Sequence, residues 1–309
     1  MKKFVVKRNS LYKLIYNTMC RASSVLPGDV KEAFKRALND ETQEIAKWHL
    51  ATTLKNQEIA EKDKTFCCPD TGYPLYYIRI GDNIEVEEGF SSICYICNEV
   101  TSKLTEEAKL RKTMVDPFTH YNPGTNVVSG MPNVEIIFDS EIEYIEITAC
   151  PKGGGSEIFG TFYKMMVPAD GEKGILKFIY ESAKKAIQNG KTCPPNVLGV
   201  GIGGTADLCM KLAKEACLLR PIGDRHPEKR IAKLEDKILK DINSLGIGPM
   251  GSGGLTTCFD VHIEYAGVHT AALPVAFNTQ CSICRRSTSI LYKDGTIKIK
   301  DYPEWFKRS

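Results

Sequence analysis

Three glycine-rich loops constrain the fold of this chain more than any other feature of its sequence. They cover Pro151–Glu157, Gly199–Gly204 and Gly246–Gly254, and each lies close to a segment with strand character. Glycine lets the backbone turn sharply or approach a ligand closely, and a helix that follows such a loop presents N–H groups to an anion. The loops therefore suit a compact, multiply charged ligand, although a tight turn is the simpler explanation of any single loop.

Helical and strand-like segments are mixed along the chain, which predicts an α/β or α+β fold. Helical spacing of apolar residues marks an N-terminal helical segment at 1–65 and further helices at 90–110, 172–189, 205–219 and 228–244. Strand-like segments lie at 74–80, 134–138, 142–148, 197–202, 260–265 and 273–279. Asp294-Gly295 predicts the turn of a final hairpin around 289–299.

Composition excludes several classes of protein. The chain of 309 residues is 42% hydrophobic, and no apolar run approaches the roughly 18–20 residues that span a bilayer. The basic N-terminus lacks the apolar core of a signal peptide. The net charge is only +3, without a long basic run, which argues against nucleic acid. We expect a cytoplasmic protein whose 12 cysteines are available for metal binding or catalysis.

Three of these cysteines lie at loop edges, where a side chain can point at a shared centre. Cys68 precedes Pro69-Asp70-Thr71-Gly72, Cys193 precedes two prolines, and Cys281 follows an apolar strand. Their wide separation excludes a local zinc-finger spacing, so the fold would have to assemble any metal centre. Three thiolates can hold a [4Fe–4S] cluster and leave one iron open as a Lewis acid. The alternative is three buried thiols near turns.

Two further motifs suggest competing sites. Cys94-x-x-Cys97 and Cys281-x-x-Cys284 could together bind zinc, but the first pair lies in an apolar, helical stretch. The run Gly199–Gly204 matches the dinucleotide fingerprint G-x-G-x-x-G. A second strand ending in an acidic residue should follow, and the sequence has none before Asp224. We therefore treat Cys67, Cys97 and Cys284 as bystanders and disfavour a nucleotide-dependent oxidoreductase.

Taken in order, the motifs resemble the α subunit of the Fe–S-dependent class I fumarase and L-tartrate dehydratase family. Any one of them is weak, but the ordered set is specific and spans residues 68 to 285. The matching segments are Cys68–Gly72, Pro151–Glu157, Cys193–Pro195 with Gly199–Gly204, Gly246–Thr257, and His269–Ala276 leading to Cys281 and Arg285.

The resemblance implies roles for individual residues. The cluster ligands would be Cys68, Cys193 and Cys281. The residues facing the substrate as catalytic groups would be Asp70, Arg111 and His269. The remaining substrate-binding residues would be Gly153, Gly154 and Arg285. Read without the resemblance, Asp70 is a turn residue, Arg111 a surface cation and His269 a buried histidine.

The resemblance also implies an activity and a partner. The chain would dehydrate a small hydroxy-dicarboxylic acid reversibly, malate to fumarate or tartrate to oxaloacetate, as a single catalytic domain over 1–309 with its cluster and substrate region at 66–288. A separate β subunit would complete the site, supply the principal base and form a hetero-oligomer such as α2β2.

Two positions depart from the family's usual residues. Pro69 stands where glutamine is usual, and Ile158 where asparagine is usual. Both leave the identity of the acid open, and they leave a non-catalytic metal-binding subunit as the alternative function.

Overall fold

The computed structural model describes residues 4–306, which form two compact units. Unit 1 is built from Met1–Pro27, Gln57–Lys152 and Arg285–Ser309, and unit 2 from Gly28–Asn56 and Gly153–Cys284. Helices and sheets occur in both, which confirms the predicted mixed α/β class. The prediction of one catalytic domain over 1–309, whose ends at 1–3 and 307–309 lie outside the described residues, stays a prediction.

Unit 1 is centred on a five-stranded sheet with the strand order β11-β10-β5-β2-β4. The strands are β2 (Tyr73–Gly81), β4 (Asn133–Asp139), β5 (Tyr144–Lys152), β10 (Ser287–Tyr292) and β11 (Ile297–Lys300). β2 pairs parallel with β4 and antiparallel with β5, and β10 pairs antiparallel with β5 and β11. Two short parallel strands, β1 (Phe4–Val6) and β3 (Ile84–Val86), form a separate pair.

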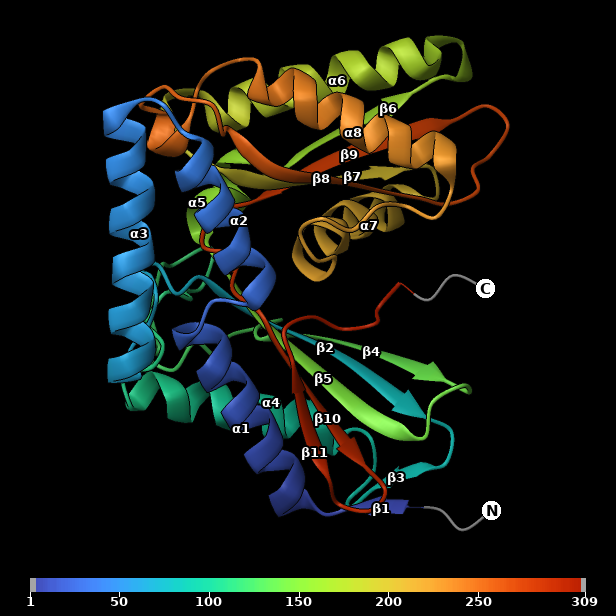
Figure 1. Ribbon diagram of the computed structural model, residues 1–309. Coiled ribbons are helices and arrows are strands. Elements are labelled where there is room, and N and C mark those ends of the chain that lie inside the picture. Colours follow the sequence, from blue (N-terminus) through green and yellow to red (C-terminus); the bar gives the residue numbers. More distant parts are fainter. Residues whose placement is uncertain (1–3, 307–309) are drawn as a thin grey trace. The chain divides into compact units, whose positions relative to one another are not determined.

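The two faces of this sheet differ because side chains alternate along each strand. Ile78 of β2 lies opposite Ile147 of β5, and both are buried in an apolar core with residues of α1 (Arg8–Ser24) and α4 (Ser92–Glu106). These two helices cover that face in Figure 1. On the other face the Nη1 atom of Arg79 lies 3.2 Å from Oε1 of Glu146.

Unit 2 contains a four-stranded sheet with the order β6-β9-β7-β8. Its strands are β6 (Phe162–Met166), β7 (Asn196–Ile202), β8 (Cys258–Tyr265) and β9 (Leu273–Gln280). β7 runs parallel to β8 and antiparallel to β9. The helix α7 (Ala206–Leu219) covers one face, and α6 (Gly171–Ile187) and α8 (Lys229–Asn243) cover the other (Figure 1).

The remaining helices are short or lie outside the sheets. They are α2 (Gly28–Asp40), α3 (Glu44–Asp63) and α5 (Gly154–Phe159), and α3 passes from unit 2 into unit 1 at residues 56–57. The predicted helical segment at 1–65 thus contains the three helices α1, α2 and α3, but it was wrong at its start, where the strand β1 precedes them. Among residues 4–306, no helix combines the length and the hydropathy that crossing a bilayer requires.

The predicted loop over Pro151–Glu157 was wrong in part. β5 continues through Lys152, and Gly154 already begins α5. Consecutive glycines favour no regular structure on their own, so tertiary contacts decide the conformation here. The strand β6 was not predicted, because its sequence Phe162–Met166 contains no alternation of apolar and polar residues.

Candidate active site

The loop that carries Cys68 is anchored at the start of β2 by neighbouring helices of unit 1. The backbone N–H of Cys67 donates to the carbonyl of Ser23 at 2.8 Å, and Gln57 Nε2 donates to the carbonyl of Cys67 at 3.2 Å. Cys67 is buried, whereas Cys68 is half-buried. The loop therefore fixes the backbone of one cysteine and leaves the next side chain accessible.

Arg111 is held against the same loop. Its backbone N–H donates to Thr71 Oγ1 at 2.9 Å, and its Nη1 atom donates to the carbonyl of Pro69 at 3.0 Å. Thr113 Oγ1 donates to the carbonyl of Gly72 at 3.0 Å. The structure thus brings Cys68, Asp70 and Arg111 together in unit 1, with Arg111 exposed and Asp70 half-buried.

The fourth predicted residue of unit 1 is Arg285, which is 1% exposed. Its Nε, Nη1 and Nη2 atoms have no hydrogen-bond partner among the described residues. Burial raises the pKa of the Cys67 thiol to about 11, and the positive charge of Arg285 opposes this rise. Arg285 is therefore near the cysteine loop, with a guanidinium whose donors are available for an anionic ligand.

In unit 2, a backbone hydrogen bond joins the loops of the other two cysteines. The N–H of Ser282 donates to the carbonyl of Cys193 at 3.0 Å, so Cys281 is one residue from this bond. Asn196 strengthens the junction, because its Nδ2 atom donates to the carbonyls of Thr192 and Gln280. The two loops meet because β7 begins at the edge of the sheet where its antiparallel neighbour β9 ends.

Cys193 has an unusual backbone conformation. Its φ is +51°, in the left-handed region that costs a residue other than glycine about 1 kcal/mol or more. The side chain is exposed, while Cys281 is 8% exposed. A strained, exposed cysteine beside a second cysteine is an arrangement expected at a functional site.

The short helix α5 packs at the same edge of unit 2. Ser156 Oγ donates to the carbonyl of Gly153 at 2.9 Å, and Thr279 Oγ1 donates to the carbonyl of Ser156 at 3.1 Å. A Cβ atom on Gly155 would lie 3.5 Å from the carbonyl oxygen of Lys191, close to the Cys193 loop. This contact places α5 next to the segment that leads to Cys193, while the substrate-binding roles of Gly153 and Gly154 stay predictions.

Sequence reasoning did not assign Gln280, the residue before Cys281. Its side chain is 1% exposed, and its Nε2 atom has no hydrogen-bond partner among residues 4–306. An amide that is buried in this way can donate to a negatively charged sulfur or sulfide. Its position next to a candidate ligand was the only signal in the sequence.

The third glycine-rich loop, Gly246–Gly254, packs against the Cys193 loop. A Cβ atom on Gly190 would lie 2.4 Å from the carbonyl oxygen of Met250, and Met250 N–H donates to the carbonyl of Pro194. At its other end, Leu255 N–H donates to Glu41 Oε2 at 2.8 Å. The third glycine-rich loop thus holds the Cys193 loop in place, through contacts with other parts of unit 2.

His269 lies at the opposite edge of the unit 2 sheet from the two cysteines. It precedes β9, whereas Cys281 follows β9, so an eight-residue strand separates them, about 20 Å or more in length. His269 is exposed, which contradicts the alternative of a buried histidine, and its Nδ1 atom accepts the N–H of Ala271 at 3.2 Å. The structure does not bring His269 to the cysteine pair of its own chain.

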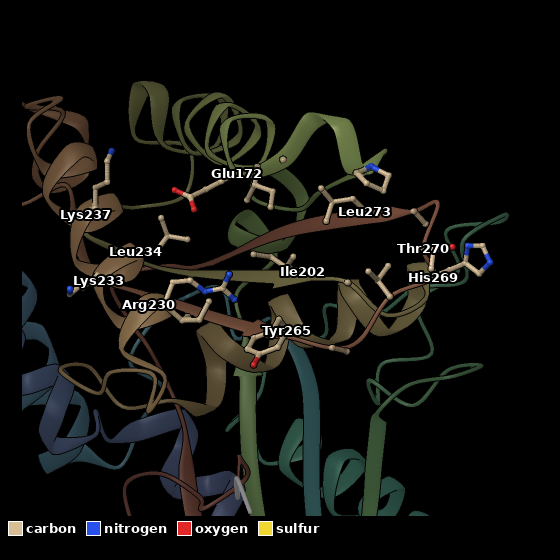
Figure 2. Close-up of a pocket in the computed structure, with 18 of the residues that line it drawn as sticks. Glu172, Ile202, Arg230, Lys233, Leu234, Lys237, Tyr265, His269, Thr270 and Leu273 are labelled. Atoms are coloured by element: carbon tan, nitrogen blue, oxygen red, sulfur yellow. The ribbon is translucent and has the colours of Figure 1, made fainter.

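His269 lines a cavity of about 880 Å³ in unit 2, which Figure 2 shows. The cavity lies between α6 and α8, at the carboxyl ends of β7 and β8. It is therefore separated from Cys193 and Cys281 by the length of the sheet.

The two competing sites receive no support. Gly199 and Gly201 lie inside β7, and a Cβ atom on either would lie 2.0 Å from a backbone oxygen of α7. These glycines serve close strand–helix packing instead of a phosphate-binding turn. For the zinc alternative, Cys97 is buried in α4 while Cys94 is exposed, and no group of three or more His, Cys, Asp or Glu that could hold a metal ion is found anywhere among the described residues.

Comparison with known proteins gives a consistent result. The sequence profile of the fumarate hydratase (Fumerase) family matches residues 12–290. A putative L(+)-tartrate dehydratase subunit alpha of Methanocaldococcus jannaschii is 46% identical over 277 residues, which cover 89% of this chain and 95% of the relative. The L(+)-tartrate dehydratase subunit alpha of Escherichia coli is 32% identical over 292 residues, 94% of this chain and 93% of the relative.

These matches define the class of the chain as a hydro-lyase, an enzyme that adds or removes water. The chain belongs to the fumarate hydratase (Fumerase) family. The resemblance inferred from the ordered motifs is thereby confirmed.

Proposed function

We propose that this chain is the α-type subunit of a hydro-lyase that dehydrates a small hydroxy-dicarboxylic acid, with a [4Fe–4S] cluster bound to Cys68, Cys193 and Cys281. The observation that carries the proposal is the hydrogen bond between Ser282 and Cys193, which joins the two candidate ligand loops at one edge of the unit 2 sheet. The third ligand, Cys68 of unit 1, is proposed from its place in the ordered set of motifs.

The residues present fit such a cluster. Thiolates are the usual protein ligands of iron–sulfur clusters, and the three cysteines form no disulfide. The buried Nε2 atom of Gln280 is a suitable donor to a sulfide or thiolate beside Cys281. When bound through three cysteines, a [4Fe–4S] cluster supplies an iron that acts as a Lewis acid toward a hydroxyl and a carboxylate.

The chain's own residues would bind and orient the acid. Arg285 and Arg111 are the two arginines near the loop that carries Cys68. A guanidinium can bind a carboxylate through two parallel hydrogen bonds. Backbone N–H groups at Gly153 and Gly154 would donate to a carboxylate oxygen. Asp70, half-buried beside Cys68, would accept or return a proton at its carboxylate. The substrate role of His269 stays a prediction, since it lies at the far edge of unit 2.

A second subunit is part of the proposal. Both reported relatives are named alpha subunits, which implies a β partner. We infer that this partner supplies the principal base for the C–H proton, in a hetero-oligomer such as α2β2. A reducing compartment such as the cytoplasm would keep the three thiols available for the cluster.

The names of the relatives favour L(+)-tartrate as the acid. The two positions that depart from the family's usual residues, Pro69 and Ile158, do not exclude tartrate. Pro69 contributes its backbone carbonyl to Arg111, which any residue would offer, and Ile158 is 67% exposed on α5. We therefore propose tartrate first and malate second.

The test is turnover by the two-subunit enzyme. The chain and its second subunit should be purified together without oxygen and assayed for oxaloacetate formed from L(+)-tartrate and for fumarate formed from malate. We expect turnover of one of the two acids, and loss of at least about 99% of it in Cys193→Ser. An iron-loaded complex that converts neither acid would contradict the proposal and favour a non-catalytic metal-binding subunit.

A further inference from the structure

We propose that the cavity between α6 and α8 of unit 2 is a second ligand site, which binds a small molecule carrying an anionic group on an apolar body. Its volume of about 880 Å³ lies within the range of small-molecule sites. Its place at the carboxyl ends of the parallel strands β7 and β8 is where α/β sheets bind ligands. It is distinct from the cysteine edge, which lies at the other ends of the same strands.

The interior of the cavity is apolar. Ile202 and Leu273 of the sheet line it together with Leu234 of α8 and Ile175 of α6, and Figure 2 shows Ile202 between Leu234 and Leu273. A four-carbon dicarboxylic acid has no apolar body to cover these side chains. The ligand therefore belongs to a different chemical class from the substrate proposed above.

The wall formed by α8 is cationic. Lys229, Arg230, Lys233 and Lys237 line the cavity, while Glu172 is the only acidic residue among its described lining residues. Figure 2 shows Arg230, Lys233 and Lys237 along this wall, with Glu172 on the side of α6.

Two of these four cations are not engaged in an ion pair among the described residues. Arg230 pairs with Glu228 and Lys237 with Asp241, at 3.1 and 2.7 Å. Within residues 4–306, neither Lys229 nor Lys233 takes part in an ion pair. Unpaired ammonium groups at the wall of an apolar cavity attract an anion whose remainder is apolar. This charge pattern selects the ligand class.

The experiment measures binding of 8-anilinonaphthalene-1-sulfonate, an apolar anion, to the full chain by fluorescence. The matched neutral probe is N-phenyl-1-naphthylamine, which has the same rings without the sulfonate. We expect saturable binding of the sulfonate at one site. The variant Lys229→Glu/Lys233→Glu should weaken this binding at least about tenfold, because two attractive charges become repulsive, and should leave the neutral probe nearly unaffected.

The matched control is Lys173→Glu/Lys177→Glu, two exposed lysines of α6 that do not line the cavity. It changes the net charge equally and should bind the sulfonate like the unaltered chain. Competition by octanoate or by 2-naphthoate would support the proposal and tell a chain-like ligand from an aromatic one. Equal weakening in both double variants would overturn the proposal.

One further outcome would replace the small-molecule proposal with a different one. If the sulfonate binds the chain alone but not the complex with the second subunit, a protein segment covers the cavity and the small-molecule proposal is wrong. Turnover and iron content of the Lys229→Glu/Lys233→Glu variant should equal those of the unaltered enzyme. A failure of the cavity proposal is therefore distinguishable from a failure of the hydro-lyase proposal.

Discussion

The guanidinium of Arg285 contrasts with that of Arg79, another buried arginine of unit 1. Arg79 lies 3.2 Å from Glu146 and also pairs with Asp139, so its charge is neutralised within the sheet. Arg285 has no hydrogen-bond partner for any of its three nitrogens among the described residues. A buried cation without a partner costs several kcal/mol, so a ligand that completes it would account for its presence.

Replacing Arg285 by methionine should separate function from stability. The apolar side chain has a similar length and removes an uncompensated charge, so we expect an unchanged or higher melting temperature. Turnover should fall, with kcat/KM reduced about 100-fold, because a bidentate carboxylate contact is lost. Thermal unfolding and steady-state kinetics of the two-subunit enzyme measure both.

Arg79→Met is the control for that experiment. It should lower the melting temperature, because Glu146 and Asp139 would keep a buried charge without a partner. If Arg285→Met unfolds as readily as Arg79→Met, then Arg285 is structural and its role at the carboxylate is wrong.

At the scale of elements, the close packing of β7 on α7 depends on the absence of side chains. A Cβ atom on Gly201 would lie 2.0 Å from the carbonyl oxygen of Cys209 and 2.9 Å from the nitrogen of Ala213. Both are backbone atoms, which cannot move without moving the helix. The glycine pattern of this strand is therefore a packing requirement.

We expect Gly201→Ala to destabilise the protein by about 3 kcal/mol through this overpacking. Gly267→Ala is the matched control, because a Cβ atom there meets nothing within 4 Å, and its effect should be small. Urea unfolding at neutral pH measures the difference. Equal stabilities for the two variants would show that α7 can shift without cost.

Glu41, between α2 and α3, accepts a hydrogen bond from Leu255 at the end of the third glycine-rich loop. Burial opposes its ionisation, but backbone N–H donors of Gln43, Leu255 and Thr42 outweigh burial and lower the pKa of its carboxyl group. A carboxyl whose pKa is lower in the folded chain stabilises the fold in its ionised form. This contribution is complete above the ordinary value of 4.5 and is lost as the pH falls through the lowered pKa.

Glu41→Ala should therefore cost about 1–3 kcal/mol of unfolding free energy at pH 7. The gap between the variant and the unaltered chain should narrow as the pH drops below 4.5. Glu44→Ala, at a side chain that is 92% exposed, should have little effect at either pH. A gap that stays constant down to pH 3 would argue against the ionised carboxylate as the cause.

For the whole molecule, the sequence predicted the elements better than their grouping. Periodicity identified β2, β7, β8 and β9, since each combines an apolar run with turn residues at its ends. The division into two units was not predictable, because the chain passes between them at residues 27, 56, 152 and 284. No composition change marks these crossings.

The candidate site was only partly predictable, because its assembly also depends on how the strands pair. The ordered motifs predicted Cys68, Cys193 and Cys281 as ligands, which stays a prediction, and the meeting of the last two loops depends on the antiparallel pairing of β7 with β9. The distance of His269 from Cys281 could have been inferred, since a predicted strand at 273–279 separates them. The burial of the Gln280 amide and the hydrogen bond from Leu255 to Glu41 depend on tertiary contacts, which no local sequence pattern predicts.

The most direct test of the account is the iron and acid-labile sulfide content of the chain after anaerobic reconstitution. The unaltered chain should hold about four irons and four sulfides. Cys68→Ser, Cys193→Ser and Cys281→Ser should each lose most of the cluster, while Cys94→Ser, at an exposed cysteine of α4, should keep it. Full iron content in Cys68→Ser would contradict the proposal that Cys68 is a ligand of the cluster.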